Sequence, residues 1–218
     1  MMHETILSLV GRTPLVRFTK INPNPSVTFA GKLESVNPGG SIKDRVALAM
    51  IEAAERSGEL TPGKVIIEAT SGNTGIGLAM VCAVKGYALK LLMPSSASEE
   101  RKRIMQAYGA EIVLTPGHLG TDGAIEESYR LAREEPDRYV LMDQYNNPAS
   151  IEAHYRGTAR EIWEQTQGGV THVVMALGTS GTAMGTVRKL KELSEKVRVI
   201  AVEPYAGHRI QGLKNMKE

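Results

Sequence analysis

Lys43 stands in the segment PGGSIKDR (residues 38–45), behind a glycine pair, a serine and an isoleucine. Glycines allow another molecule to approach the backbone closely. We expect Ser41 to cap a helix, with Asp44 completing a weak capping box, which puts Lys43 at the second helical position. A helix N-terminus and burial both favour the neutral amine over the ammonium ion. Because a neutral amine attacks carbonyl carbons, Lys43 is a candidate Schiff-base lysine; the alternative is an ordinary surface lysine.

A second polar turn, TSGNTG (residues 70–75), follows an apolar run and precedes a helical pattern. It offers three hydroxyl groups and one amide, together with the backbone N–H groups of a helix start. Such a turn suits a carboxylate or a phenolic oxygen. A plain helix cap is the alternative interpretation.

A third turn, GTSGT (residues 178–182), also joins an apolar run to a helical pattern. Its N–H groups and hydroxyls form a potential phosphate cradle, although a purely structural turn is an open alternative. No lysine follows the last glycine, which argues against a nucleotide-binding loop of the Walker type. The glycines at 178, 181 and 185 do not match the G-x-G-x-x-G spacing of dinucleotide sites either.

Short apolar runs alternate with amphipathic segments along most of the chain. We predict strands at residues 15–18, 27–34, 65–69, 89–93, 111–114, 139–142, 172–177 and 197–202. We predict helices at residues 42–57, 74–85, 98–108, 122–134, 151–165 and 182–193. This alternation indicates an α/β fold with open, mostly parallel sheets and helices on both faces. In such sheets ligands bind beyond the carboxyl ends of the strands, where the turns at 70 and 178 begin.

Composition excludes several classes of function. The 218 residues carry a net charge of +2, and no cluster of basic residues with aromatics predicts a nucleic-acid partner. No segment has the length and apolarity to cross a membrane. Cys82 is the single cysteine, so an internal disulfide is impossible and we expect a cytoplasmic protein. We expect no metal site, because no metal-ligand spacing relates the five histidines, His3, His118, His154, His172 and His208.

An amine nucleophile, a turn for an organic acid and a phosphate cradle are together what pyridoxal phosphate and an amino-acid substrate require. The chain resembles the β-family (fold type II) of pyridoxal-phosphate enzymes, and within it the B-type cysteine synthases, or O-acetylserine sulfhydrylases. The three motifs occur in the order and spacing of that family, and the resemblance runs from Thr13 to the end of the chain.

The resemblance implies a role for each motif residue. Lys43 would bind pyridoxal 5'-phosphate and remove the α-proton of the substrate, and Asn73 would hydrogen-bond the 3'-oxygen of the cofactor. The cofactor phosphate would be bound by Gly178, Thr179, Ser180, Gly181 and Thr182. The substrate carboxylate would be bound by Thr70, Ser71, Thr74 and Gln144. Lys214 falls where relatives that use anionic substrates carry a basic residue, so an anionic leaving group or sulfur donor is a hypothesis.

The implied reaction is β-replacement, in which an O-activated serine loses its leaving group and accepts sulfur from a donor to become cysteine. Two alternatives stay open at this point. One is β-elimination of the serine/threonine dehydratase type, which needs no sulfur donor. The other is a noncatalytic fragment that binds an amino acid.

The resemblance also implies two domains and a homodimer. Residues 1–37 and 146–218 would form a larger domain that binds the cofactor phosphate, and residues 38–145 a smaller domain that binds the substrate carboxylate. Members of the family continue for several further strands and helices, one of which carries a serine that faces the pyridine nitrogen. We therefore expect the C-terminal part of the family fold to be absent and the larger domain to be incomplete.

Overall fold

The computed structural model describes residues 2–208, 210–215 and 217. Its strands are β1 (Leu15–Arg17), β2 (Ala30–Lys32), β3 (Val65–Ala69), β4 (Ala88–Pro94), β5 (Glu111–Thr115), β6 (Tyr139–Leu141), β7 (His172–Ala176) and β8 (Arg198–Val202). Its α-helices are α1 (Lys43–Ser57), α2 (Asn73–Lys85), α3 (Glu99–Ala107), α4 (Gly120–Glu134), α5 (Pro148–Ala153), α6 (Ala159–Gln165) and α7 (Gly181–Leu193). The shorter elements are three 3-10 turns, η1 (Ile6–Leu9), η2 (Glu34–Val36) and η3 (Gly117–Leu119), and a π-helical turn, η4 (His154–Thr158).

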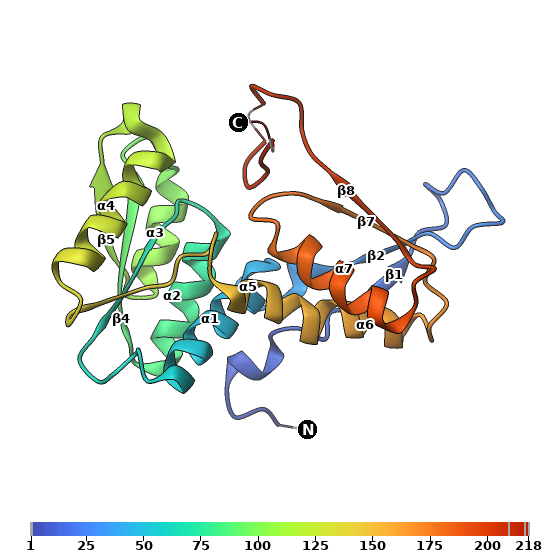
Figure 1. The fold of residues 1–218 in the computed structure, drawn as a ribbon, viewed down its shortest axis with the longest axis horizontal. Helices are drawn as coiled ribbons and strands as arrows, with labels where there is room; N and C mark the ends of the chain where they lie inside the picture. Colours follow the sequence, from blue (N-terminus) through green and yellow to red (C-terminus); the bar gives the residue numbers. More distant parts are fainter. Residues whose placement is uncertain (1, 209, 216, 218) are drawn as a thin grey trace.

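The strands form three sheets. A four-stranded sheet has the order β5-β4-β3-β6, with every pair parallel. β7 and β8 form a parallel pair, and β1 and β2 an antiparallel pair. In Figure 1 the four-stranded sheet lies at the left with α2, α3 and α4, the two small sheets lie at the right with α6 and α7, and α1 and α5 lie between them. The predicted α/β class with mostly parallel pairing is confirmed.

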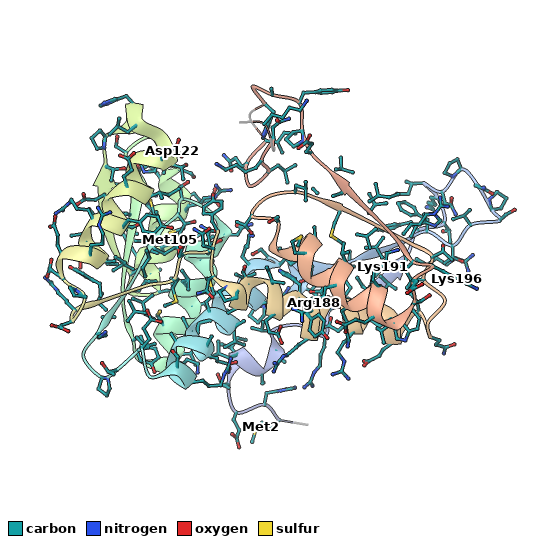
Figure 2. The ribbon with its side chains drawn as sticks, viewed as in Figure 1. Met2, Met105, Asp122, Arg188, Lys191 and Lys196 are labelled. Atoms are coloured by element: carbon teal, nitrogen blue, oxygen red, sulfur yellow. The ribbon has the colours of Figure 1, made fainter. Side chains whose placement is uncertain are left out.

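Helices cover both faces of the four-stranded sheet. On β3, Ile66 belongs to a core cluster with residues of α1 and α2, whereas the next residue, Ile67, belongs to a cluster with Ala124 of α4. Successive strand residues point to opposite faces, so this split places α4 on one face and α1 and α2 on the other. Figure 2 shows Met105 of α3 inside this half of the molecule, where its side chain is fully buried.

The helix that carries Lys43 packs closely on the helix that follows the TSGNTG turn. A Cβ added to Gly77 of α2 would lie 3.1 Å from Cβ of Ala47 and 3.2 Å from the carbonyl oxygen of Lys43. A larger residue at position 77 would push α1 and α2 apart. This glycine therefore keeps the first turn of α1 next to the start of α2.

Two predicted elements differ from the structure by more than two residues at an end. The strand predicted over 27–34 is limited to β2, because the chain turns into η2 at Glu34, whose carboxylate binds Arg45. The single helix predicted over 151–165 begins earlier, at Pro148 behind an Asn147 cap, and contains the π turn η4. Periodicity did not reveal that turn, because one extra residue within a continuous helical segment leaves the apolar pattern almost unchanged.

The mixed charges at the end of α7 form a solvated face. Arg188, Lys191 and Lys196 are exposed, and Figure 2 shows them on the right-hand half of the molecule, on α7 and the loop that follows it. Within residues 2–208, 210–215 and 217, no helix is long and apolar enough to span a bilayer.

Candidate active site

Lys43 is the first residue of α1, and its amine reaches the third polar turn. The Nζ atom lies 3.4 Å from Oγ1 of Thr179, so the structure brings together two motifs that are far apart in the sequence. Burial lowers the pKa of Lys43. Burial thus shifts Lys43 toward the neutral amine, in the direction expected from the sequence.

The start of α1 differs in detail from the prediction. The helix begins at Lys43 rather than one residue earlier, although the Ser41 hydroxyl still accepts a hydrogen bond from the Lys43 backbone N–H at 3.1 Å. The Asp44 carboxylate accepts from the backbone N–H of Gly39 at 2.6 Å. A Cβ on Gly39 would lie only 2.6 Å from Oδ1 of Asp44, so this turn requires glycine. Burial raises the pKa of Asp44 to about 6.

A buried ion network anchors α1 behind the lysine. Arg45 pairs with Glu34 of η2 at 2.7 Å and with Glu161 of α6 at 2.6 Å. Lys32 of β2 also reaches Glu161, at 2.7 Å. Burial alone would raise the pKa of Glu161, but hydrogen bonds from Arg45 and Lys32 outweigh it and hold the pKa at about 2. The network joins α1, β2, η2 and α6, and thereby fixes the direction in which α1 begins.

The TSGNTG turn leads from β3 into α2, as predicted. Thr70 and Thr74 are buried, whereas the side chain of Asn73 is exposed at the first position of α2. No side chain caps this helix, whose N-cap is Gly72. A Cβ on Gly75 would lie 2.7 Å from Cε of Met105, so α3 packs directly against the turn. The backbone N–H groups at the start of α2 are therefore held in place without a side-chain acceptor.

Gln144 follows β6 and reaches this turn. Thr74 donates a hydrogen bond from Oγ1 to Oε1 of Gln144 at 2.7 Å. On its other side Gln144 contacts Glu68 of β3, to which its backbone N–H and its side-chain amide donate at 3.3 and 3.4 Å. Four of the residues assigned to the substrate carboxylate thus come from two neighbouring loops, at the ends of β3 and β6.

Glu68 is absent from the sequence-based assignment. It is 2% exposed, and burial together with the nearby charge of Asp143 raises its pKa to about 8. The signal that could have revealed it is a carboxylate inside the otherwise apolar strand VIIEA. Because a buried acid needs hydrogen-bond partners, an acidic residue within an apolar strand predicts a polar contact from another part of the fold.

The GTSGT turn joins β7 to α7. Ser180 has a left-handed backbone (φ 63°), and α7 begins at Gly181 without a side-chain cap. The first N–H groups of α7 are thus oriented by the turn and available to an anion. A Cβ on Gly178 would lie 2.5 Å from the carbonyl oxygen of Gly212, so the segment around residue 212 passes directly over this turn.

His154 is a buried residue that contacts the GTSGT turn. Its two ring nitrogens contact the hydroxyls of Thr182 at 3.2 Å and Thr158 at 3.0 Å. It is 1% exposed, and burial lowers its pKa to about 3, so the ring is neutral at physiological pH. In the sequence, this residue is only one of five histidines without metal-ligand spacing. The contact with Thr182 depends on the packing of α7 against η4, for which local sequence carries no signal.

Lys214 lies at the edge of these loops. Its backbone N–H donates to the carbonyl of Leu177 at 3.0 Å, and its Nζ atom lies 5.7 Å from the ring centre of Tyr145, the neighbour of Gln144. The structure therefore places this exposed cation beside the loop that follows β6. Two buried residues, His154 and Glu68, thus join the predicted site residues through their contacts with Thr182 and Gln144.

These residues fit pyridoxal phosphate. The amine of Lys43 can bind an aldehyde, and Thr179, next to it, belongs to the turn whose free N–H groups suit a phosphate. The hydroxyls and N–H groups between β3 and α2 suit the carboxylate of an amino acid. Fold and site together define an enzyme class that binds an amino acid beside a lysine-bound, phosphorylated aldehyde.

The chain belongs to the family described as pyridoxal-phosphate dependent enzyme, whose family model matches residues 6–216. It is 52% identical to a cysteine synthase of Aquifex aeolicus, over 99% of this chain and 67% of that protein. It is 47% identical to cysteine synthase B of Salmonella typhimurium, over 97% of this chain and 69% of that protein. The chain thus spans about two thirds of the length of these relatives.

Solved structures show the same relationship. A cysteine synthase from Entamoeba histolytica superposes with a TM-score of 0.93 at 43% identity, over 98% of this chain and 67% of that one. An O-ureido-L-serine synthase gives a TM-score of 0.93 at 39% identity, over 99% of this chain and 71% of that one. The family resemblance, its fold and its cofactor, pyridoxal phosphate, are confirmed.

Proposed function

We propose that this protein is a cysteine synthase, which replaces the leaving group of an O-activated serine with sulfur from a donor. The observation that carries the proposal is the half-buried Lys43 amine, 3.4 Å from Thr179 and one helix away from the TSGNTG turn. Relatives named cysteine synthase, at 46–52% identity, favour β-replacement over elimination of the dehydratase type and over a noncatalytic fragment.

Lys43 moves the proton in this reaction. Bound pyridoxal phosphate supplies an electron sink, which makes the α-proton of the amino acid acidic. The Lys43 amine, whose pKa is lowered by burial, accepts that proton from a fixed position at the start of α1. The ion pairs of Arg45 hold α1 in place while the proton moves.

The polar turns orient the reactants. The backbone N–H groups and hydroxyls of the turn formed by Gly178, Thr179, Ser180, Gly181 and Thr182 bind the phosphate, and His154 supports Thr182 from the opposite side. Asn73 contacts the 3'-oxygen of the cofactor. The substrate carboxylate is bound by Thr70, Ser71, Thr74 and Gln144, of which Thr74 and Gln144 are already joined by a hydrogen bond. Fixing both reactants beside Lys43 lowers the entropic part of the barrier.

The division of the chain follows the sheets. Residues 38–145 form the smaller domain with the substrate-carboxylate turn, because all four strands of the larger sheet lie in this range. Residues 1–37 and 146–218 form the larger domain with the phosphate turn. The protein acts as a homodimer in the cytoplasm. Lys214, beside Tyr145, favours an anionic leaving group or sulfur donor.

The test combines a spectrum with a product assay. The purified chain is mixed with pyridoxal phosphate, and a visible absorbance band of the lysine-bound cofactor is expected. O-acetylserine or O-phosphoserine is then added with sulfide or thiosulfate, and cysteine is expected, with little pyruvate. Lys43→Ala should abolish the band and the turnover together. Formation of pyruvate alone, or an unchanged band in Lys43→Ala, would contradict the proposal.

A further inference from the structure

Glu68 is a buried carboxyl group that the proposed reaction does not use. It lies on β3, a central strand of the four-stranded sheet, opposite Leu91 of β4. Only 2% of it is exposed, and among the described residues it has no ion pair with a lysine, an arginine or a histidine. Burying an acid in this way is unfavourable unless its hydrogen bonds are satisfied.

Apart from a backbone hydrogen bond at its neighbour Ala69, the partner of Glu68 is Gln144. The backbone N–H of Gln144 lies 3.3 Å from Oε2 of Glu68, and Nε2 of its side chain lies 3.4 Å from Oε1. The remaining contacts of that side chain are the carbonyl of Ala69 at 3.4 Å and the hydroxyl of Thr74 at 2.7 Å. Glu68 therefore contacts both the backbone and the side chain of Gln144 through hydrogen bonds, and Gln144 in turn contacts Thr74.

We propose that Glu68 is a positioning residue, which orients the Gln144 amide so that Gln144 and Thr74 bind the substrate carboxylate. The inference rests on the proposed function, since it concerns how that site recognises its amino acid. Glu68 itself touches neither substrate nor cofactor. It acts only through Gln144.

The loop that carries Gln144 needs such a support. Its residue Asp143 has a left-handed backbone (φ 50°), a conformation that a side chain other than glycine adopts at a cost. Tyr129 of α4 holds the Asp143 carboxylate at 2.7 Å, and Asn146 contacts it at 3.1 Å. These contacts fix the loop backbone. The hydrogen bonds to Glu68 fix the direction of the Gln144 side chain.

The protonation state of Glu68 determines which hydrogen bonds it can form with Gln144. The charged group that acts on Glu68 is Asp143 in the same loop, with Tyr129 and Tyr145 nearby; the Asp143 carboxylate disfavours a second negative charge. Burial and these groups keep Glu68 mainly neutral at pH 7. A neutral carboxyl accepts one hydrogen bond, from the Gln144 backbone, and donates one.

In the structure Nε2 of Gln144 faces Glu68 and the Ala69 carbonyl, and its side-chain oxygen accepts from Thr74. Rotation of the amide about its last bond exchanges the two atoms and gives up the contact with Ala69. The oxygen then accepts the proton of Glu68, and the N–H groups point toward Thr74 and toward a carboxylate bound there. A carboxylate is acceptor-only, so Gln144 must present a donor to bind it. Neutral Glu68 thus selects the orientation of Gln144 that the substrate requires.

Two substitutions separate this role from a general effect on folding. Glu68→Gln keeps one acceptor and one donor and is the isostere of the neutral acid. Glu68→Leu fills the same space without hydrogen bonds. Ser128→Ala is the matched control, because Ser128 is also buried beside this sheet but bonds only within its own helix.

The first experiment uses the chain loaded with pyridoxal phosphate. Dissociation constants of L-serine and of ethanolamine, which is serine without its carboxylate, are measured from changes in the visible band. Glu68→Leu should weaken serine binding about tenfold and leave ethanolamine unchanged, whereas Glu68→Gln and Ser128→Ala should stay within about twofold of the unmodified chain. Equal weakening of both amines by Glu68→Leu, or failure of Glu68→Gln to preserve serine binding, would overturn the inference.

The second experiment needs no cofactor and therefore separates this inference from the proposed function. Hydrogen exchange is followed in the peptide that spans residues 142–147. Glu68→Leu should speed exchange of the Gln144 backbone amide about tenfold, and Glu68→Gln should leave it unchanged. Unchanged exchange in Glu68→Leu would refute the inference. A chain that passes this test but shows no band with pyridoxal phosphate would refute the proposed function instead.

Discussion

Nζ of Lys43 lies 3.4 Å from Oγ1 of Thr179, although 136 positions separate the two residues in the chain. The first belongs to the start of α1 and the second to the turn before α7, so the contact joins the two halves of the molecule seen in Figure 1. A lysine that binds an aldehyde and a turn that binds its phosphate must lie within the length of one small molecule. This distance meets that requirement.

Thr179 gives the first prediction. Thr179→Val removes the hydroxyl beside Lys43 and keeps the shape of the side chain, so the affinity for pyridoxal phosphate should fall about tenfold, the effect of one hydrogen bond. Titration of the visible band with cofactor measures this. Thr61→Val, at an exposed threonine far along the chain, is the control. Equal affinities in the two variants would show that Thr179 does not take part in cofactor binding.

The positions of the strands could be predicted from the sequence because each is a short apolar run. Residues 65–69 form β3 as predicted, and the predicted ends of β4 to β8 are wrong by one residue at most. The π turn η4 and the short β2 could not be predicted. Both depend on contacts with distant residues, such as Arg45 and Thr182, that local patterns do not record.

The site residues also fall into two groups, those that the sequence revealed and those that it did not. Lys43, the TSGNTG turn and the GTSGT turn were identified because each is a compact motif with an unusual density of glycine and hydroxyl groups. Glu68 and His154 were not, because each is a single polar residue outside any such motif. Their roles come from the residues that packing brings against them, Gln144 and Thr182.

The Arg45 network gives a prediction about stability. Arg45→Met leaves the buried carboxylates of Glu34 and Glu161 without their main partner, which should lower the free energy of unfolding by about 3 kcal/mol at pH 7. Urea denaturation measures this. Arg56→Met, which breaks only an exposed pair with Glu52, should cost under about 1 kcal/mol. Similar losses in both variants would show that the buried network adds no particular stability.

The same network predicts a dependence on acid. The pKa of Glu161 is lowered to about 2 in the folded protein, so its contribution to stability is complete above about pH 4.5, its ordinary range, and is lost as the pH falls toward 2. Glu161→Gln should therefore be less stable than the unmodified chain at pH 6, and the difference should shrink at pH 3. Unfolding curves at both pH values provide the comparison. A difference that stays constant would mean that the charge of Glu161 is not responsible.

His154 predicts a second pH effect, in a higher range. Its pKa is lowered to about 3 by burial, whereas an unfolded histidine takes up a proton near pH 6.5. Lowering the pH from 7 to 5 therefore stabilises the unfolded state, and this one residue should cost about 2 kcal/mol of stability over that interval. His154→Gln keeps a polar group of similar size and should lose this part of the decline. A decline in His154→Gln as large as that of the unmodified chain would contradict this prediction.

Gly185 tests how tightly the phosphate turn is held. A Cβ at this position of α7 would lie 2.8 Å from the backbone nitrogen of Tyr155 and 2.9 Å from Cβ of His154, both in η4. Gly185→Ala must move α7 away from η4, which should cost about 2 kcal/mol and stretch the contact between His154 and Thr182. Pyridoxal phosphate should then bind more weakly, although no group that contacts it has been removed. Gly72→Ala, where the added Cβ meets open space, should leave the thermal midpoint almost unchanged. If Gly185→Ala unfolds at the same temperature as the unmodified chain, α7 and η4 are not packed as described. The proposed support of the turn by His154 would then be wrong as well.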